Sequence, residues 1–106
     1  MVVNRFDIYL VELDPAVGGE IKKTRPCIII SPNEMNYLKT VLIAPMTTKG
    51  FDAPSRVKLQ FQDKTGLVLL DQLRAVDKSR LVKKLGTIDA KTQKIISSTL
   101  VDMFEM

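Results

Sequence analysis

The chain has 106 residues, which is enough for one domain with a single hydrophobic core. Its composition, 45% hydrophobic and 26% charged, argues against disorder, and its net charge is +4. The absence of histidine and the presence of one cysteine exclude an internal disulfide, the usual zinc ligand sets and catalytic pairs built on histidine. Arg5 and Asp7 interrupt the N-terminal apolar residues, and no apolar run approaches a membrane span. We expect one cytoplasmic domain over residues 1–106, with no membrane partner.

Short apolar segments separated by turn-forming residues follow one another through most of the chain. They are 6–13, 26–31, 40–46, 56–61 and 67–76. In the segment RVKLQF, Val57, Leu59 and Phe61 alternate with polar residues, as in a strand with one buried face. Five strands at this spacing predict a mainly β protein, with a small, bent antiparallel sheet or a partly closed barrel.

The connections between these segments have signals of their own. Residues 31–36, SPNEMN, predict a turn or a single helical turn opened by a Ser or Asn cap. Residues 62–66, QDKTG, predict a hairpin connection in which Gly66 is available for a positive φ. Residues 77–86 are compatible with either a short helix or a strand ended by Gly86.

The last segment has the period of an amphipathic helix, with Asp89 as its expected N-cap. Its apolar side contains Ile95, Ile96, Thr99, Leu100, Met103 and Phe104. We expect this helix to cover one face of the sheet, with its Met and Phe side chains in the core.

Positive charge is concentrated in one part of the chain. Residues 21–58 contain seven basic and two acidic residues, which indicates either a polyanionic partner or a solvated face. Cys27, within the run PCIII, is expected to be a buried and inert thiol.

Three polar clusters interrupt or end apolar strands. They are Glu20, Lys22, Lys23 and Arg25; Thr47, Thr48 and Lys49; and Asp71, Gln72 and Arg74. A carboxylate within LVLLDQL needs a hydrogen-bonding or cationic partner, so Asp71 has a purely structural alternative as a paired residue at a bend. Arg25 could likewise have a purely structural role, paired with Asp71 or Glu20 at a strand end. For Thr47 and Thr48 the structural alternative is helix or turn capping.

The order of these motifs resembles the MazF/PemK/Kid family of toxin endoribonucleases. The similarity begins with RFDIYLVELDPAVGGEIKKTRPCIIIS and continues through SPNEMN, IAPMTT and GLVLLDQLRAVD into the C-terminal helix. Short motifs such as D-P or R-P are weak singly. The ordered set D-P-x-x-G-x-E, R-P, P-x-T and D-Q-x-R is specific, and it extends over essentially the whole chain.

The resemblance implies an SH3-like barrel with added helices, assembled as a homodimer. It also implies a metal-independent, cofactor-free enzyme that cuts single-stranded RNA, usually mRNA, through attack by a 2′-hydroxyl. The products would carry a 2′,3′-cyclic phosphate and a 5′-hydroxyl, and the cutting would inhibit translation and growth. A cognate antitoxin would neutralise the toxin with an extended acidic C-terminal segment, and DNA would be a partner only indirectly, through the antitoxin.

The resemblance also implies roles for particular residues. Arg25 matches the R-P arginine and would stabilise charge on the phosphorane, since its pKa makes it a poor general acid. Thr47 matches the catalytic threonine and would orient the phosphate or the 2′-hydroxyl. Glu20 is a candidate base or a partner of Arg25, and Asp71 would fill an acid/base role or support the groove. The expected RNA-binding residues are Gly18, Gly19, Lys22, Lys23, Thr48, Lys49, Arg56, Gln72 and Arg74.

One branch of the family differs from this chain. Kid-like members have a histidine and an arginine at the positions of Gly19 and Leu69, so their acid/base assignment does not transfer. Two other classes also remain open: a non-catalytic CcdB-like toxin that binds a protein such as gyrase through its C-terminal helix, and a non-toxic SH3-like binding module.

Overall fold

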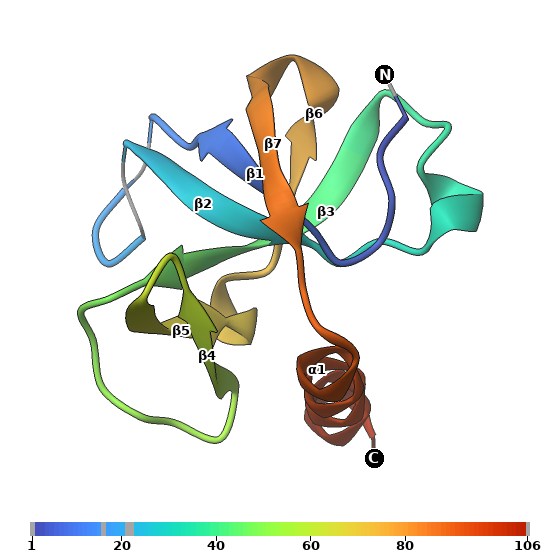
Figure 1. Cartoon of the computed structure of the whole chain (residues 1–106). Helices are drawn as coiled ribbons and strands as arrows, with labels where there is room; N and C mark the ends of the chain where they lie inside the picture. The colour runs from blue at the N-terminus through green and yellow to red at the C-terminus, as the bar shows by residue number, and fades with distance from the viewer. Residues whose placement is uncertain (1, 16, 21–22, 106) are drawn as a thin grey trace.

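Seven strands and one α-helix form the described part of the chain, residues 2–15, 17–20 and 23–105 of a computed structural model (Figure 1). The strands are β1 (Asp7–Glu12), β2 (Thr24–Ile29), β3 (Thr40–Thr47), β4 (Arg56–Phe61), β5 (Lys64–Leu69), β6 (Arg74–Asp77) and β7 (Leu81–Thr87). Short 3₁₀ turns lie at η1 (Asn33–Met35), η2 (Leu70–Gln72) and η3 (Lys78–Arg80), and the helix α1 runs over Ala90–Phe104. Within the described residues, no helix is long and apolar enough to cross a membrane.

The strands pair in the order β4-β5-β3-β2-β1-β7, and β6 also pairs with β3. All pairs are antiparallel, and β3 is shared: its first half pairs with β6, whereas Met46 and Thr47 at its end pair with β5. The sheet is curled into a half-barrel with the C-terminal helix packed beside it, which confirms the predicted fold class.

The sheet is buried on both faces. Ile28 and Ala44 belong to one apolar cluster, which includes Ile96 of α1, while Cys27 and Ile29 belong to a second cluster. Successive strand residues point to opposite faces, so the central strands consist almost entirely of apolar residues. The ends of β2 and β3 are therefore where polar side chains reach the surface.

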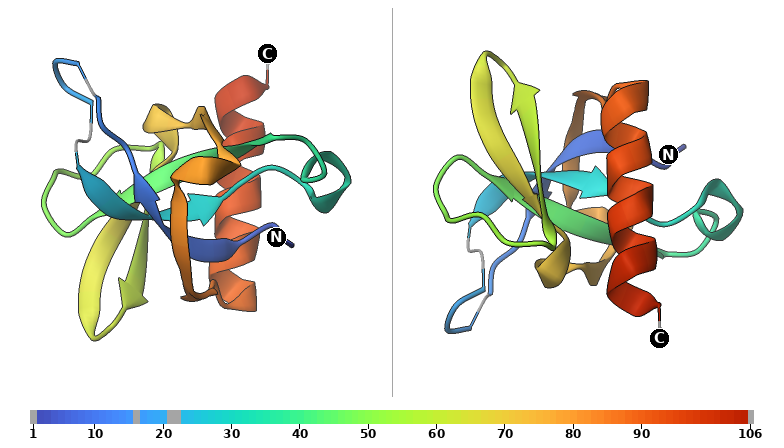
Figure 2. Two further views of the ribbon diagram at one scale, coloured as in Figure 1. Left: turned by 90° about the horizontal axis from the view of Figure 1, so that it is seen from above. Right: turned by 90° about the horizontal axis from the view of Figure 1, so that it is seen from below.

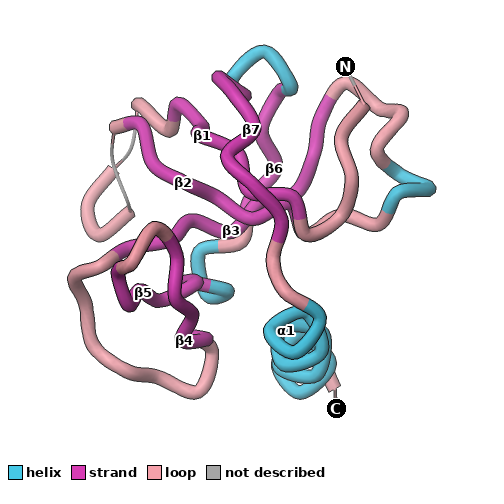
Figure 3. The backbone as a smooth tube through the Cα atoms, in the orientation of Figure 1, coloured by secondary structure: helices cyan, strands magenta, loops and turns pink. Residues whose placement is uncertain are grey.

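The predicted strand 67–76 is wrong as a single element. The 3₁₀ turn η2 divides it into β5 and β6, as the cyan turn between them shows in Figure 3. Leu70 remains buried in this turn, whereas Asp71 leaves the apolar run and binds Arg56. The cost of burying an unpaired carboxylate explains why the chain bends here rather than continuing as a strand.

The hairpin expected over residues 62–66 is present, but the positive φ values fall at its first two residues and not at Gly66. Gln62 and Asp63 take positive φ values of 51° and 62°, as in the two-residue turn whose twist matches that of the strands. Gly66 lies within β5, where an added Cβ would come 3.1 Å from the Thr47 carbonyl oxygen. Glycine is needed there for close approach to β3 rather than for a turn.

The N-terminus of α1 is as predicted, because the Asp89 Oδ1 accepts a 2.7 Å hydrogen bond from the Thr92 amide. Its apolar side is narrower than expected. Ile96 is buried, with Leu100 and Met103 partly buried against the same cluster, but Phe104 is 70% exposed. Phe104 lies on the flank of the stripe, since each helical residue turns by roughly 100°.

Two other connections are settled by the structure. Residues 33–35 form the expected single turn, but no side chain caps it, because the Ser31 hydroxyl donates to Asn36 Oδ1 instead. The ambiguous segment after Asp77 is the turn η3 followed by the strand β7, with Gly86 inside that strand.

Candidate active site

Arg25 and Thr47 line the same cavity, of about 220 Å³, which we call the Arg25–Thr47 cavity. The antiparallel pairing of β2 with β3 ends at Cys27 and Pro45, and Arg25 and Thr47 each lie two residues beyond it on their own strand. The other lining residues are Pro26, Met46, Thr48, Phe61, Gln62, Lys64 and Gly66. Two predicted catalytic residues therefore meet where β2 begins and β3 ends.

The Arg25–Thr47 cavity is cationic. Arg25 and Lys64 line it, and no carboxylate belongs to its described lining. Three of its lining residues, Phe61, Gln62 and Lys64, come from the tip of the β4–β5 hairpin. Such a site suits a phosphate group, because a guanidinium donates paired hydrogen bonds and an ammonium adds a point charge.

The hydroxyl group of Thr47 is held by the backbone of the following turn. Its Oγ1 donates a 2.8 Å hydrogen bond to the Lys49 carbonyl and accepts one of 3.1 Å from the Lys49 amide. This is the turn capping weighed from the sequence, in a side chain that is only 9% exposed. A hydroxyl has two acceptor lone pairs, so one remains for a ligand.

Asp71 and Glu20 line a second cavity, also of about 220 Å³, which we call the Glu20–Asp71 cavity. Its other lining residues are Leu13, Pro45, Gln72, Leu73 and Arg74. Pro45 directly precedes Met46 and Thr47, so β3 passes from one cavity to the other. The predicted catalytic residues are therefore divided between two neighbouring cavities.

The Asp71 carboxylate is engaged by Arg56. Its Oδ1 accepts from Arg56 Nε at 3.2 Å and its Oδ2 from Arg56 Nη2 at 3.1 Å, while the Ser55 hydroxyl donates to Oδ1 at 3.1 Å. These hydrogen bonds, led by that of Arg56, hold the pKa of Asp71 below its ordinary value of 3.8. The expectation of a partner for Asp71 is confirmed, and that partner is Arg56.

Glu20 is bonded within the β1–β2 connection. Its Oε1 accepts a 2.6 Å hydrogen bond from the Val17 amide, and its own amide donates to the Val17 carbonyl at 3.2 Å. Gln72 Nε2 donates to the Gly19 carbonyl at 3.4 Å, which ties this connection to η2. The two polar segments, one around Glu20 and the other around Asp71, are thus in contact in the folded chain.

The remaining predicted RNA-binding residues lie in or near the β1–β2 connection and the two cavities. Gly18 and Lys23 have φ values of 60° and 68°, and the Lys23 amide donates to Asp14 Oδ1 at 2.9 Å. Lys49 holds Thr47 through its backbone, and Arg74 Nη1 donates to the Leu13 carbonyl at 3.5 Å. Lys22 lies outside the described residues.

Three segments project from the same side of the molecule: the described part of the β1–β2 connection, the β3–β4 connection and the β4–β5 hairpin. They lie at the left in both panels of Figure 2, whereas α1 crosses the right. The two cavities are lined by residues of these segments and of the strands between them. This side of the molecule is therefore the candidate active site.

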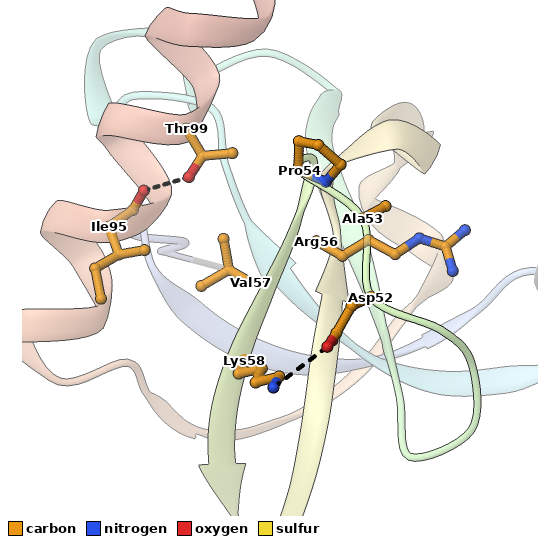
Figure 4. A pocket seen from close by; sticks show the side chains of 8 residues that line it. All are labelled: Asp52, Ala53, Pro54, Arg56, Val57, Lys58, Ile95 and Thr99. Carbon is orange, nitrogen blue, oxygen red and sulfur yellow. Dashed lines mark hydrogen bonds and ion pairs between the residues drawn. The ribbon is translucent and has the colours of Figure 1, made fainter.

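A larger cavity of about 590 Å³ lies between β4, the preceding loop and α1 (Figure 4). Its lining includes Pro54, Val57, Ile95 and Thr99, but no predicted catalytic residue. The Arg56 guanidinium points away from the helix in this view, so only its aliphatic stem borders the cavity. Size alone thus does not identify the reactive site.

Cys27 is fully buried, and burial raises the pKa of its thiol to about 12. It is therefore a neutral thiol at physiological pH, which confirms the expectation of an inert side chain. Within the described residues, no group of three His, Cys, Asp or Glu side chains could hold a metal ion.

Comparison with known proteins decides the family. Residues 4–104 match the sequence description of the PemK-like, MazF-like toxin of type II toxin-antitoxin systems. The chain belongs to this PemK/MazF family. It is 33% identical to the endoribonuclease MazF of Staphylococcus saprophyticus over 106 aligned positions, covering 93% of this chain and 88% of that protein.

Solved structures of PemK/MazF proteins have the same fold. The crystal structure of MazF from Deinococcus radiodurans superposes with a TM-score of 0.85 at 24% identity, covering 100% of this chain and 99% of that one. The Mycobacterium tuberculosis toxin MazF-mt6 gives a TM-score of 0.79 at 19% identity, covering 94% of this chain and 97% of that one. At these identities the likeness establishes the fold.

The sequence reasoning missed the contribution of the β4–β5 hairpin to this PemK/MazF site. Gln62 and Lys64 line the Arg25–Thr47 cavity but lie far from Arg25 in the sequence. The available signal was the alternation on either side of Gln62 and Asp63, which marks a two-residue hairpin turn. The prediction of a five-residue connection over 62–66 did not identify Gln62 and Asp63 as the turn.

Proposed function

We propose that this PemK/MazF chain is the toxin of a toxin–antitoxin pair, and that it cuts single-stranded RNA at short sequences without a metal ion. The observation that carries the proposal is the meeting of Arg25 and Thr47 in one cationic cavity. Membership in the family and 33% identity to an endoribonuclease MazF support it. Cutting mRNA in the cytoplasm would inhibit translation and growth.

The proposed reaction is an intramolecular transfer at phosphorus. The 2′-oxygen forms a bond to phosphorus, the bond from phosphorus to the 5′-oxygen breaks, and the products are a 2′,3′-cyclic phosphate and a 5′-hydroxyl. A base must accept the proton of the 2′-hydroxyl, and a proton must reach the departing 5′-oxygen. The two transfers balance, so no cofactor is consumed.

Arg25 would stabilise the phosphorane, because its guanidinium can donate to two non-bridging oxygens as their charge increases. Thr47 would orient the 2′-hydroxyl. Since its proton is donated to the Lys49 carbonyl, its remaining acceptor lone pair is the group available to the substrate. Lys64 would bind a neighbouring phosphate.

Glu20 is the candidate base, as an acceptor that lines the neighbouring cavity. For Asp71 the contacts favour the supporting role over the acid/base role. A carboxylate with a lowered pKa is almost fully ionised at neutral pH and has little proton to donate. It would instead hold Arg56 and the turn η2 that borders the groove.

We also propose a homodimer and a cognate antitoxin with an extended acidic segment. A cavity lined by Arg25 and Lys64 attracts carboxylates as it attracts phosphates, so an acidic peptide can compete with RNA for it. DNA contact would occur only through the antitoxin.

The test is cleavage of a long single-stranded RNA by the purified protein in EDTA, with wild type compared with Arg25→Ala. Cuts at a short recurring sequence, with cyclic phosphate and 5′-hydroxyl ends, are expected from the wild type alone. Circular dichroism establishes that the variant is folded. Intact RNA after incubation with the wild type would contradict the proposal and leave the non-catalytic, CcdB-like alternative.

A further inference from the structure

Phe51 is an exposed aromatic residue in the loop between β3 and β4. Its side chain is 71% exposed, yet one face of the ring is covered by the Arg56 guanidinium, whose Cζ lies 4.5 Å from the ring centroid. The Arg56 side chain is itself only 12% exposed. The ring therefore rests on a largely covered cation and presents its other face to solvent.

The guanidinium beneath Phe51 is fixed from two directions. Asp71 binds its Nε and Nη2 atoms, and Nη1 donates to the Phe51 carbonyl at 3.3 Å. A bidentate pair with an added backbone bond holds the plane of the guanidinium. The ring stacked on it loses much of the freedom that an exposed loop side chain normally has, so little ordering remains to be done when a ligand binds.

A cavity of about 260 Å³ lies against the loop that carries this ring. It is lined by Gly50 and Asp52, the two chain neighbours of Phe51, and by Thr48, Lys58, Thr65, Gly66 and Leu67. Thr48 and Gly66 also line the Arg25–Thr47 cavity, so the two cavities adjoin. A strand of RNA with its scissile phosphate at Arg25 would thus pass the rim where Phe51 stands.

The charges of this adjoining cavity differ from those around Arg25. Lys58 Nζ lies 3.3 Å from Asp52 Oδ2, and this ion pair leaves the lining without excess charge. A neutral polar cavity next to a flat ring suits a nucleobase better than a phosphate, because bases stack on aromatic rings and donate to or accept from polar groups.

We infer that Phe51 is a stacking platform for an unpaired nucleobase next to the scissile phosphate, and that Arg56 and Asp71 are positioning residues that hold the ring. The inference rests on the proposed RNA cleavage and names a base subsite for it. The subsite tolerates any base through stacking, and the polar groups of the adjoining cavity favour some bases over others.

The experiment measures binding and cleavage separately. A short RNA containing the cleavage site, with a 2′-deoxy sugar at the scissile nucleotide, binds but lacks the attacking hydroxyl. The fluorescent base 2-aminopurine is placed in turn at each position, and quenching by the protein identifies the stacked base. Kinetics with the cleavable RNA give KM and kcat.

Phe51→Ala is expected to abolish the quenching at one position and to raise KM about tenfold, with kcat nearly unchanged. Phe51→Tyr is expected to restore both, since its ring still stacks. Tyr37→Ala is the matched control, because Tyr37 is 81% exposed but lies in the β2–β3 connection, away from these cavities; it is expected to behave as the wild type. Arg56→Gln, with Phe51 intact, is expected to weaken the quenching.

Two results would overturn the inference. Equal KM and quenching for wild type and Phe51→Ala, in a protein that cuts RNA, would remove Phe51 from the RNA site while leaving the nuclease proposal intact. If Phe51→Ala bound RNA normally but bound an acidic peptide more weakly than the wild type, the ring would be assigned to a protein partner. Absence of both binding and cleavage by the wild type is a different outcome, because it refutes the proposed function itself.

Discussion

The Arg25–Thr47 cavity and the Glu20–Asp71 cavity have the same volume and share strand β3, but different charged groups line them. The first has two cations and no carboxylate in its described lining. In the second, Asp71 is bound by Arg56 and Ser55, and Glu20 is bound by the Val17 amide. The comparison separates residues equipped to bind an anion from residues that build the walls around it.

The largest expected difference between the cavities is in the rate of cleavage. Arg25→Ala is expected to lower kcat by about 10²–10³-fold, because it removes donors to a developing negative charge. Asp71→Asn is expected to retain most of the activity, since its proposed role is supporting and the amide oxygen can still accept one of the two Arg56 hydrogen bonds. Single-turnover cleavage measures both variants. Equal losses would show that the two cavities form one catalytic unit.

Thr47→Val should produce the next largest effect, a decrease in kcat of about tenfold, because the acceptor for the 2′-hydroxyl is lost. The variant also loses the bonds to Lys49, so Thr47→Ser serves as the control that retains them. Cleavage rates of the two variants are compared at a temperature at which thermal unfolding shows both to be folded. Full activity of Thr47→Val would limit Thr47 to its turn-capping role.

The next smaller effect is expected at Lys64, and it concerns RNA binding rather than the rate of cleavage. Lys64→Gln should weaken RNA binding and lower the magnitude of the slope of log K against log salt by about 0.7, the value for one phosphate contact with a single strand. Lys83→Gln is a suitable control, because Lys83 is exposed on β7, outside both cavities. An unchanged slope for Lys64→Gln would exclude a phosphate contact by the hairpin.

The smallest expected effect concerns acid stability. The pKa of Asp71 is lowered in the folded chain, so below its ordinary value of 3.8 the unfolded chain binds more protons and stability falls as pH decreases. Asp71→Asn should be less stable than the wild type at neutral pH. Between about pH 5 and about pH 2 it should lose less of its stability than the wild type does. Asp102→Asn, at an exposed position of α1, is the control. Urea unfolding at several pH values supplies the comparison.

The sequence predicts most of the fold because its strands are short, apolar and separated by turn residues. Strand β4 was predicted with its observed bounds, and Asp89 was identified as the cap of α1. The break at Asp71 depends on a tertiary partner, Arg56, and no local pattern reveals which cation will pair with this carboxylate. The exposure of Phe104 likewise depends on how wide a side of the helix the core covers, which the helical period alone does not give.

Residues of the candidate site were predicted unevenly. Arg25 and Thr47 belong to recognisable motifs, and the antiparallel register of β2 and β3 explains why distant motifs meet. Gln62, Lys64 and Phe51 belong to no such motif. Gln62 and Lys64 reach the Arg25–Thr47 cavity through hairpin geometry, and Phe51 is held by a stacked guanidinium; only the folded chain brings these groups together.

The two-residue turn at Gln62 and Asp63 has a consequence for how this protein could diversify. The tip of the hairpin supplies Gln62 and Lys64 to the Arg25–Thr47 cavity, but neither residue belongs to an apolar cluster of the sheet. Its strand β4 forms one end of the strand order. Changes of length or side chain at this tip can therefore alter which RNA is accepted while leaving the folding core and Arg25 unchanged, so recognition can be exchanged as a module.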